Sequence, residues 1–252
     1  MVQFRYNTLR SDIMERGTIH DVSFFSKALQ ESIQLYIYTP ANYTPLTEYQ
    51  LLIASDGNDY FQLGGITKIA DELIDDMEID ELIIVFVPYD NVQDRRDKYV
   101  PSGKKHREYL QFLAHELVPY IDREYATTPV AHARGLIGDS MAATVSLLGA
   151  LTYPNIFGKA ILQSPYVDED VLDAVENFAN PSSISVYHIV GKKEDEVLTT
   201  EKKVADFLTP NRELHEVMQM RGYHLFYDEF NGNHTWKYWK PDLRRALIKN
   251  FN

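Results

Sequence analysis

The sequence predicts an α/β fold with a mostly parallel central sheet and helices on both faces. From residue 50 onward, short apolar segments alternate with longer helical segments, which is typical of parallel strands joined by helices. The apolar segments contain few polar residues, which indicates strands covered on both faces. With 252 residues, 44% of them hydrophobic, the chain can bury the core of one α/β domain. We therefore expect a single domain over residues 1–252, with residues 1–16 as an N-terminal extension.

Residues 18–25 and 32–38 alternate in the manner of two strands and predict an antiparallel hairpin ahead of the parallel sheet. The strands expected after it are, in chain order, 50–55, 82–87, 135–138, 159–163, 184–190 and 223–227. The expected helices are 66–77, 106–125, 142–151, 171–178, 200–221 and a last one ending at 251. The interval 164–183 is too short for a large cap domain, so we expect an open, shallow site.

Composition and charge exclude several classes of protein. A net charge of -12 argues against broad binding of nucleic acid or of an anionic membrane, because both need dense lysine and arginine. No apolar segment is long enough to cross a bilayer and residues 1–10 lack the apolar core of a signal peptide, so we expect a soluble, cytoplasmic protein. The chain has no cysteine, which excludes disulfides, thiolate zinc sites and cysteine nucleophiles.

Ser140 lies where an apolar strand ends at Gly138 and a helical segment begins at Ala142. This arrangement resembles the nucleophile elbow G-x-S-x-G, in which a strained turn exposes the serine above the sheet and small neighbours let strand and helix approach closely. Ala142 stands at the position of the last glycine. The alternative interpretation is that Ser140 only caps the following helix.

The carboxyl ends of parallel strands gather at one edge of the sheet, and three of the loops there carry a serine, acidic residues and a histidine. They are Ser140, the acidic residues of 194–196, and His234 in a Gly-Asn loop after the last strand. The order serine, acid, histidine is that of α/β-hydrolases. The alternatives are a solvated acidic loop and a structural histidine, one of eight in the chain.

From about residue 26 to its end, the chain resembles the esterase family that includes enterochelin and other siderophore esterases, esterase D and the mycolyl transferases. The segments that carry the resemblance are 36–40 (YIYTP), 55–58 (SDGN), 95–99 (RRDKY), 116–119 (ELVP), 138–143 (GDSMAA), 191–194 (GKKE) and 232–236 (GNHTW). Three positions depart from the family pattern, which commonly has glycine where this chain has Ala142, Ala143 and Asn233.

The resemblance implies an α/β-hydrolase fold without a large cap domain and a serine esterase mechanism without cofactor or metal. Ser140 would attack the ester carbonyl, and His234 would accept its proton. The acid would be Glu194, because the family carboxylate follows the strand-ending glycine, here Gly191, by three residues; Asp195 is the competing choice.

Two backbone N–H groups must stabilise the oxyanion of such a reaction. The residue after the nucleophile supplies one of them, here Met141. By resemblance, the second comes from Asn58 in the loop after an earlier strand. Gly57 suits this loop, because a flexible residue lets the chain turn the next N–H group inward.

The substrate is expected to be a small-molecule ester. A basic cluster made up of Arg95, Arg96, Lys98, Lys104, Lys105 and Arg107 begins after a strand at the catalytic edge, so Arg95 and Arg96 could attract an anionic ester such as a metal-bearing siderophore. Trp236 beside His234 is a further candidate for substrate contact. The alternatives are a solvated basic surface and an aromatic residue of the core. An acyltransferase or a non-catalytic binding protein on the same fold stays open, and the sequence makes no prediction of oligomeric state.

Overall fold

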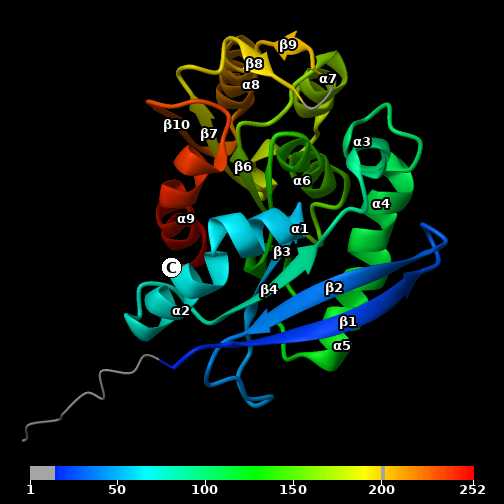
Figure 1. Cartoon of the computed structure of the whole chain (residues 1–252), viewed down its shortest axis with the longest axis vertical. Coiled ribbons are helices and arrows are strands. Elements are labelled where there is room, and N and C mark those ends of the chain that lie inside the picture. The colour runs from blue at the N-terminus through cyan, green and yellow to red at the C-terminus, as the bar shows by residue number, and fades with distance from the viewer. Residues whose placement is uncertain (1–14, 200–201) are drawn as a thin grey trace, which may run out of the picture.

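The computed structural model describes residues 15–199 and 202–252, in which the chain forms an α/β fold around one sheet of eight strands (Figure 1). Of the expected N-terminal extension, residues 1–14 lie outside the described part. The strands of the sheet are β1 (Thr18–Ser26), β2 (Glu31–Thr39), β3 (Gln50–Ser55), β4 (Leu82–Val87), β5 (Arg134–Asp139), β6 (Lys159–Gln163), β7 (Ser185–Gly191) and β10 (His224–Phe230).

The spatial order of the strands is β1-β2-β4-β3-β5-β6-β7-β10. β1 pairs with β2 in an antiparallel hairpin and β2 pairs antiparallel with β4, whereas every pair from β4 to β10 is parallel. Strand β4 is buried along its whole length, as its uninterrupted apolar sequence predicts. The predicted fold class, a mostly parallel sheet behind an N-terminal hairpin, is confirmed.

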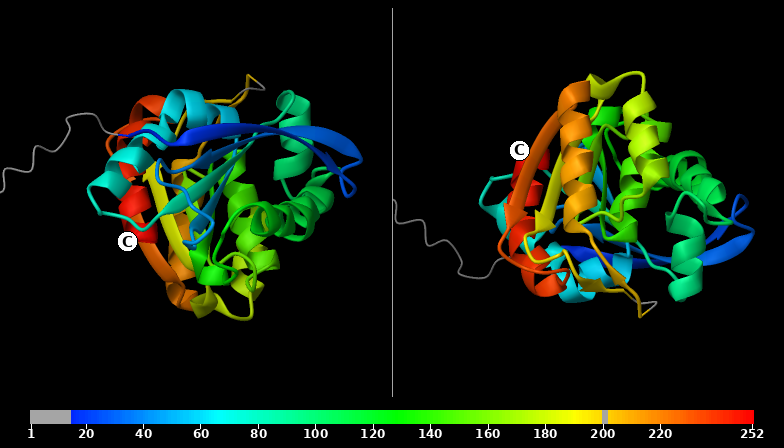
Figure 2. Two further views of the ribbon diagram at one scale, coloured as in Figure 1. Left: turned by 90° about the horizontal axis from the view of Figure 1, so that it is seen from below. Right: turned by 90° about the horizontal axis from the view of Figure 1, so that it is seen from above.

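Helices cover both faces of the sheet, with α2 and α9 on one face and α4 to α8 on the other (Figure 2). The α-helices are α1 (Gly57–Asp59), α2 (Ile66–Asp75), α3 (Val92–Tyr99), α4 (His106–Phe112), α5 (Val118–Glu124), α6 (Met141–Thr152), α7 (Glu169–Asn177), α8 (Leu208–Arg221) and α9 (Trp236–Phe251). A π-helical segment, Leu113–Leu117, joins α4 to α5, so the long helix expected over 106–125 forms with a widened turn in its middle.

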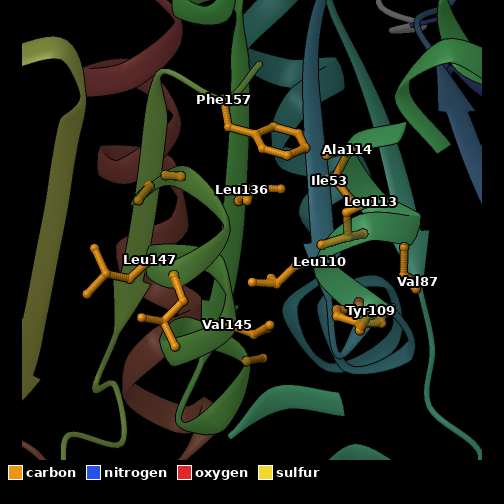
Figure 3. Close-up of a cluster of buried hydrophobic side chains, with 14 of the residues drawn as sticks. Ile53, Val87, Tyr109, Leu110, Leu113, Ala114, Leu136, Val145, Leu147 and Phe157 are labelled. Atoms are coloured by element: carbon orange, nitrogen blue, oxygen red, sulfur yellow. The ribbon is translucent and has the colours of Figure 1, made fainter. Parts of the chain in front are cut away.

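The larger of the two cores lies between the sheet and helices α4 to α6 (Figure 3). Leu110 and Val145 project from α4 and α6 toward Ile53 and Leu136 of the sheet, and all four side chains are buried. The apolar faces of these helices are thereby removed from water, at roughly 25 cal/mol per Å² of apolar surface buried. This packing holds α6 against the ends of β5 and β6.

The region before α8 differs from the sequence prediction. A helix was expected from residue 200, but α8 begins at Leu208, and residues 200–201 lie outside the described part. A two-stranded sheet made of β8 (Val197–Leu198) and β9 (Val204–Ala205) precedes the helix. The β-branched valine in each strand favours this extended pairing over a helix.

Helix α3 was not predicted, because its eight residues are almost all polar and carry no apolar periodicity. Asn91 caps it, since its side chain accepts hydrogen bonds from the backbone N–H groups of Gln93 and Asp94 at 3.0 Å each. The Asn91 cap and contacts between α3 and the rest of the fold therefore stabilise this helix, and an apolar face does not.

Strand β5 and helix α6 approach each other most closely at Gly138. A Cβ atom built at Gly138 would lie 2.1 Å from the backbone carbonyl of Ala142, a distance that no side chain can occupy. The Ala142 methyl group is itself fully buried. Glycine is thus required at the first position of the serine motif, whereas the other small position accommodates alanine.

We expect Gly138→Ala to lower the melting temperature and to abolish any serine reactivity, because strand and helix must separate to admit the methyl group. The matched control is Gly135→Ala in the same strand, where the new Cβ would meet only side-chain atoms at 3.2 Å or more. Thermal unfolding followed by circular dichroism measures the difference. Equal melting temperatures for the two variants would contradict this account of the elbow.

Candidate active site

Ser140 occupies the tight turn between β5 and α6. Its backbone has φ 53° and ψ −125°, a conformation that costs a non-glycine residue roughly 1–3 kcal/mol. Two hydrogen bonds hold the turn: the Ser140 N–H donates to the Gln163 carbonyl at 2.9 Å, and the Tyr166 N–H donates to the Ser140 carbonyl at 3.2 Å. The strained turn presents the serine at the wall of a cavity of about 630 Å³.

Glu194 and His234 meet at the same edge of the sheet. His234 Nδ1 lies 2.7 Å from Glu194 Oε2, and the Glu194 side chain is fully buried. The other carboxylate oxygen, Oε1, accepts hydrogen bonds from the Gly191 N–H and the Ser164 hydroxyl, both at 2.8 Å. Asp195, the competing acid, is exposed. The loop after β7 thus turns one of the two acidic side chains inward and the other outward.

Aromatic rings enclose the His234 imidazole. The Phe207 ring lies 4.2 Å from it between centroids, and Trp239 meets it edge-on at 4.8 Å. The Trp239 indole N–H donates to the Ser164 hydroxyl at 3.0 Å, so a chain of hydrogen bonds runs from the indole through Ser164 to Glu194. His234 lines the same cavity as Ser140.

The two expected oxyanion donors differ in their placement. Met141 is the first residue of α6, where backbone N–H groups have no partner within the helix, and it lines the cavity. Asn58 lies in the short helix α1 between Asp56 and Asp59, which both line the cavity, although Asn58 itself does not. A Cβ at Gly57 would come within 2.5 Å of the Val87 backbone nitrogen, so this loop packs tightly on β4.

Three of the six residues of the basic cluster are paired with acidic residues. Arg95 is buried and binds the Asp56 carboxylate through Nε and Nη2 at 2.5–2.9 Å. Although burial opposes the charge, Asp56 outweighs it and raises the pKa of Arg95 above its usual value. Lys98 and Lys105 both contact Glu31, at 2.6 and 2.5 Å. Only Arg95 and Arg96 of the cluster line the cavity.

Trp236 also lines the cavity, as the sequence suggested, and it contacts the Tyr60 ring edge-on at 4.8 Å between centroids. Its indole is half-buried, so it belongs partly to the second core and partly to the cavity wall. The roles assigned to the site residues stay predictions.

Asp139 was not singled out from the sequence, although it precedes the serine. It lines the cavity, and its Oδ1 atom is buried with no hydrogen-bond partner among the described residues. Burial and, next, the Asp56 carboxylate raise the pKa of Asp139 well above its usual value. Both causes disfavour the negative charge of the Asp139 carboxyl.

Ser164 and the β8–β9 pair are further parts of the site that sequence reasoning missed. Ser164 directly follows β6 at the carboxyl edge of the sheet, and that position was a usable signal. Residues of β8 and β9 form one wall of the cavity, and no sequence motif predicted this wall. The cavity therefore has a wall that the short interval 164–183 did not predict.

In the described ranges, no group of three or more histidine and acidic side chains is arranged to hold a metal ion. None of the helices in those ranges has the length and apolar content needed to cross a bilayer.

Comparison with known protein families shows to which family the chain belongs. The family model described as "Putative esterase" matches residues 26–250, nearly the whole length. The chain belongs to the Putative esterase family. Uncharacterized protein YjcH of Bacillus subtilis is 47% identical to this family member over 235 residues, which cover 93% of this chain and 98% of that protein.

Solved structures agree on the fold. A ferulic acid esterase superposes with a TM-score of 0.80 at 18% identity, covering 94% of this family member and 98% of that chain. The enterobactin esterase FES from Shigella flexneri, in the presence of enterobactin, superposes with a TM-score of 0.79 at 16% identity, covering 92% of this chain and 58% of that one. These likenesses establish the α/β-hydrolase fold of the family member.

We expect Glu194→Gln to lower kcat of ester hydrolysis by about two to four orders of magnitude, because the amide no longer supplies the charge that stabilises a protonated imidazole. Asp195→Asn is the matched control and should change kcat little, since Asp195 is exposed. Steady-state kinetics on p-nitrophenyl acetate measure both. A large loss in Asp195→Asn with none in Glu194→Gln would reverse the assignment.

Proposed function

We propose that this protein is a serine hydrolase that cleaves carboxylic esters through an acyl-enzyme intermediate. The observation that carries the proposal is the 2.7 Å contact between buried Glu194 and His234, at a cavity that Ser140 also lines from a strained turn. Membership of the esterase family supports the same chemistry. Its cytoplasmic location stays a prediction.

The hydrogen bonds around Glu194 determine which nitrogen of His234 is free. A carboxylate oxygen only accepts, so the hydrogen lies on Nδ1 and Nε2 keeps its lone pair. Nε2 can then accept the proton of Ser140 as its Oγ attacks the ester carbonyl, and return it to the leaving alcohol. Water would hydrolyse the acyl-enzyme by the same route in reverse.

The oxyanion of each tetrahedral intermediate needs donors that are already in place. The Met141 N–H at the start of α6 is the first donor in this proposal, and the α6 dipole adds positive potential there. The loop of Asp56, Gly57 and Asn58 would supply the second.

Labelling with a fluorophosphonate probe tests the nucleophile. The wild type should be labelled and Ser140→Ala should not, whereas His234→Ala should label slowly because nothing removes the serine proton. Ser183→Ala, an exposed serine on another part of the surface, is the control and should label as the wild type does. Labelling that persists in Ser140→Ala would refute the assignment, and an unlabelled wild type would favour a non-catalytic binding protein.

An enterobactin-type trilactone is our first proposal for the natural substrate. Its support is the family and the fold shared with a protein described as an enterobactin esterase. Incubation with such a trilactone and with an added alcohol tests it, since hydrolysis releases free acid and acyl transfer would release a new ester.

The β8–β9 wall of the cavity suggests that the substrate also has an apolar part. Leu198 and Val204 are cross-strand neighbours on this wall, and they are 70% and 68% exposed. Apolar side chains that line a cavity are typical of a site that takes an apolar ligand group.

Leu198→Ser with Val204→Ser should lower kcat/KM for p-nitrophenyl octanoate by about tenfold or more, equivalent to ~1.4 kcal/mol of lost apolar contact. The same variant should hydrolyse p-nitrophenyl acetate normally, because acetate is too short to reach the wall. Val130→Ser, an exposed apolar residue outside the cavity lining, is the control. Equal losses on both esters would show that the pair supports the fold and not the substrate.

A further inference from the structure

We propose that Arg95 is a positioning residue that holds together the two chain segments from which the oxyanion donors come. One segment is the loop after β3, which contains Asp56 and Asn58, and the other is the elbow around Ser140. The inference rests on the proposed esterase function. It gives Arg95 a task different from the binding of an anionic substrate that its place in a basic cluster suggested.

The contact between Arg95 and Asp56 is the first half of this link. Nε of Arg95 lies 2.8 and 2.9 Å from the two carboxylate oxygens of Asp56, and Nη2 lies 2.5 Å from one of them. Asp56 is 1% exposed and has φ 56° and ψ 40°, a left-handed conformation that is uncommon outside glycine and that aspartate adopts more readily than most residues. The planar guanidinium thus orients both oxygens of the residue at which the loop turns.

Tyr99 strengthens the hold on this loop. It lies one helical turn after Arg95 on α3, on the same face, and its hydroxyl accepts the Asp56 N–H at 3.1 Å. The hydroxyl groups of Ser55 and Tyr109 lie 2.9 Å apart just before the turn. The side chain and the backbone of Asp56 are therefore both bound by α3, the polar helix that the sequence did not predict.

The second half of the link runs from Arg95 to the elbow. Nη2 of Arg95 donates to the Asp139 carbonyl at 3.4 Å, a long hydrogen bond to the peptide group directly before Ser140. The guanidinium lies 5.7 Å from the Tyr89 ring centroid and 5.8 Å from that of Tyr99, so aromatic rings restrict its position. One side chain thereby contacts both segments.

The charge of Arg95 is matched inside the protein. Arg95 is 8% exposed and shares its guanidinium between Asp56 and a backbone carbonyl, so little of its field reaches a substrate. A buried ion pair of this kind fixes the positions of the segments it joins more than it attracts a charged ligand. We expect loss of the pair to misplace the oxyanion donors, which would slow the hydrolysis of neutral and anionic esters alike.

The test compares Arg95→Gln and Arg95→Lys with the control Arg107→Gln, an exposed arginine of the same basic cluster that does not line the cavity. The substrates are p-nitrophenyl acetate and the anionic mono-p-nitrophenyl succinate, and a trifluoromethyl ketone probes the tetrahedral state. Misplacement of catalytic groups by about 1 Å lowers the reaction rate by up to about a hundredfold. We therefore expect kcat of Arg95→Gln to fall by about tenfold to a hundredfold on both esters, with KM changed by less than about threefold.

The ketone separates positioning from a merely structural role. Its inhibition constant should rise by the same factor as kcat falls, since the adduct carries an oxyanion on Ser140. Arg95→Lys should change kcat and the inhibition constant less than Arg95→Gln does, and Tyr99→Phe should change them less again. Arg107→Gln should have the wild-type values of both. Adding Asp56→Asn to Arg95→Gln should cause little further loss, because the two side chains act as one unit. Circular dichroism checks folding, and Arg95→Lys and Tyr99→Phe carry the test if Arg95→Gln does not fold.

Other outcomes overturn the inference. A rise in KM confined to the anionic ester would make Arg95 a substrate-binding residue, and losses in kcat without any change in ketone affinity would make it structural. Wild-type kinetics for every Arg95 variant would show that the link is dispensable. A wild-type protein that neither labels nor hydrolyses esters would instead refute the proposed function, and the inference with it.

Discussion

The contact between the backbones of β5 and α6 at Gly138 constrains the whole catalytic edge. Because strand and helix come so close there, the chain must reverse within one residue, and Ser140 takes the positive φ that this reversal demands. The core between α6 and the sheet keeps the two elements together. The strain at Ser140 is thus supported by apolar packing that contains no catalytic group.

Two buried carboxylates near this turn, Glu194 and Asp56, have hydrogen-bond partners. Glu194 accepts from Gly191, Ser164 and His234, and Asp56 is bound through both its carboxylate and its N–H group. A buried carboxylate without such partners would lose its charge or disrupt the fold. Asp139, whose Oδ1 atom lacks a partner among the described residues, has a pKa raised by burial and by the Asp56 carboxylate.

The cavity has two walls of different character. On one side, the residues of β8 and β9 are apolar. On the other, Asp56 and Asp59 follow β3, and two arginines lie in the helix α3. Arg95 and Asp56 cancel each other's charge within the second wall. The basic stretch in the sequence therefore overstates the positive charge that a substrate meets, because sequence order does not show which acidic side chain lies opposite each base.

The sequence by itself determined the architecture and the elbow. Alternating strands and helices, the N-terminal hairpin and the placement of Ser140 depend on local patterns and on the rule that parallel strands end at one edge, so they could be predicted from the residues in order. The tertiary structure alone decided that Glu194 and not Asp195 turns inward, that Arg95 binds Asp56, and that β8 and β9 wall the cavity. The two buried contacts join residues about 40 positions apart, 40 for Glu194 with His234 and 39 for Arg95 with Asp56. Such contacts depend on how separate strands and helices pack, which no local pattern encodes.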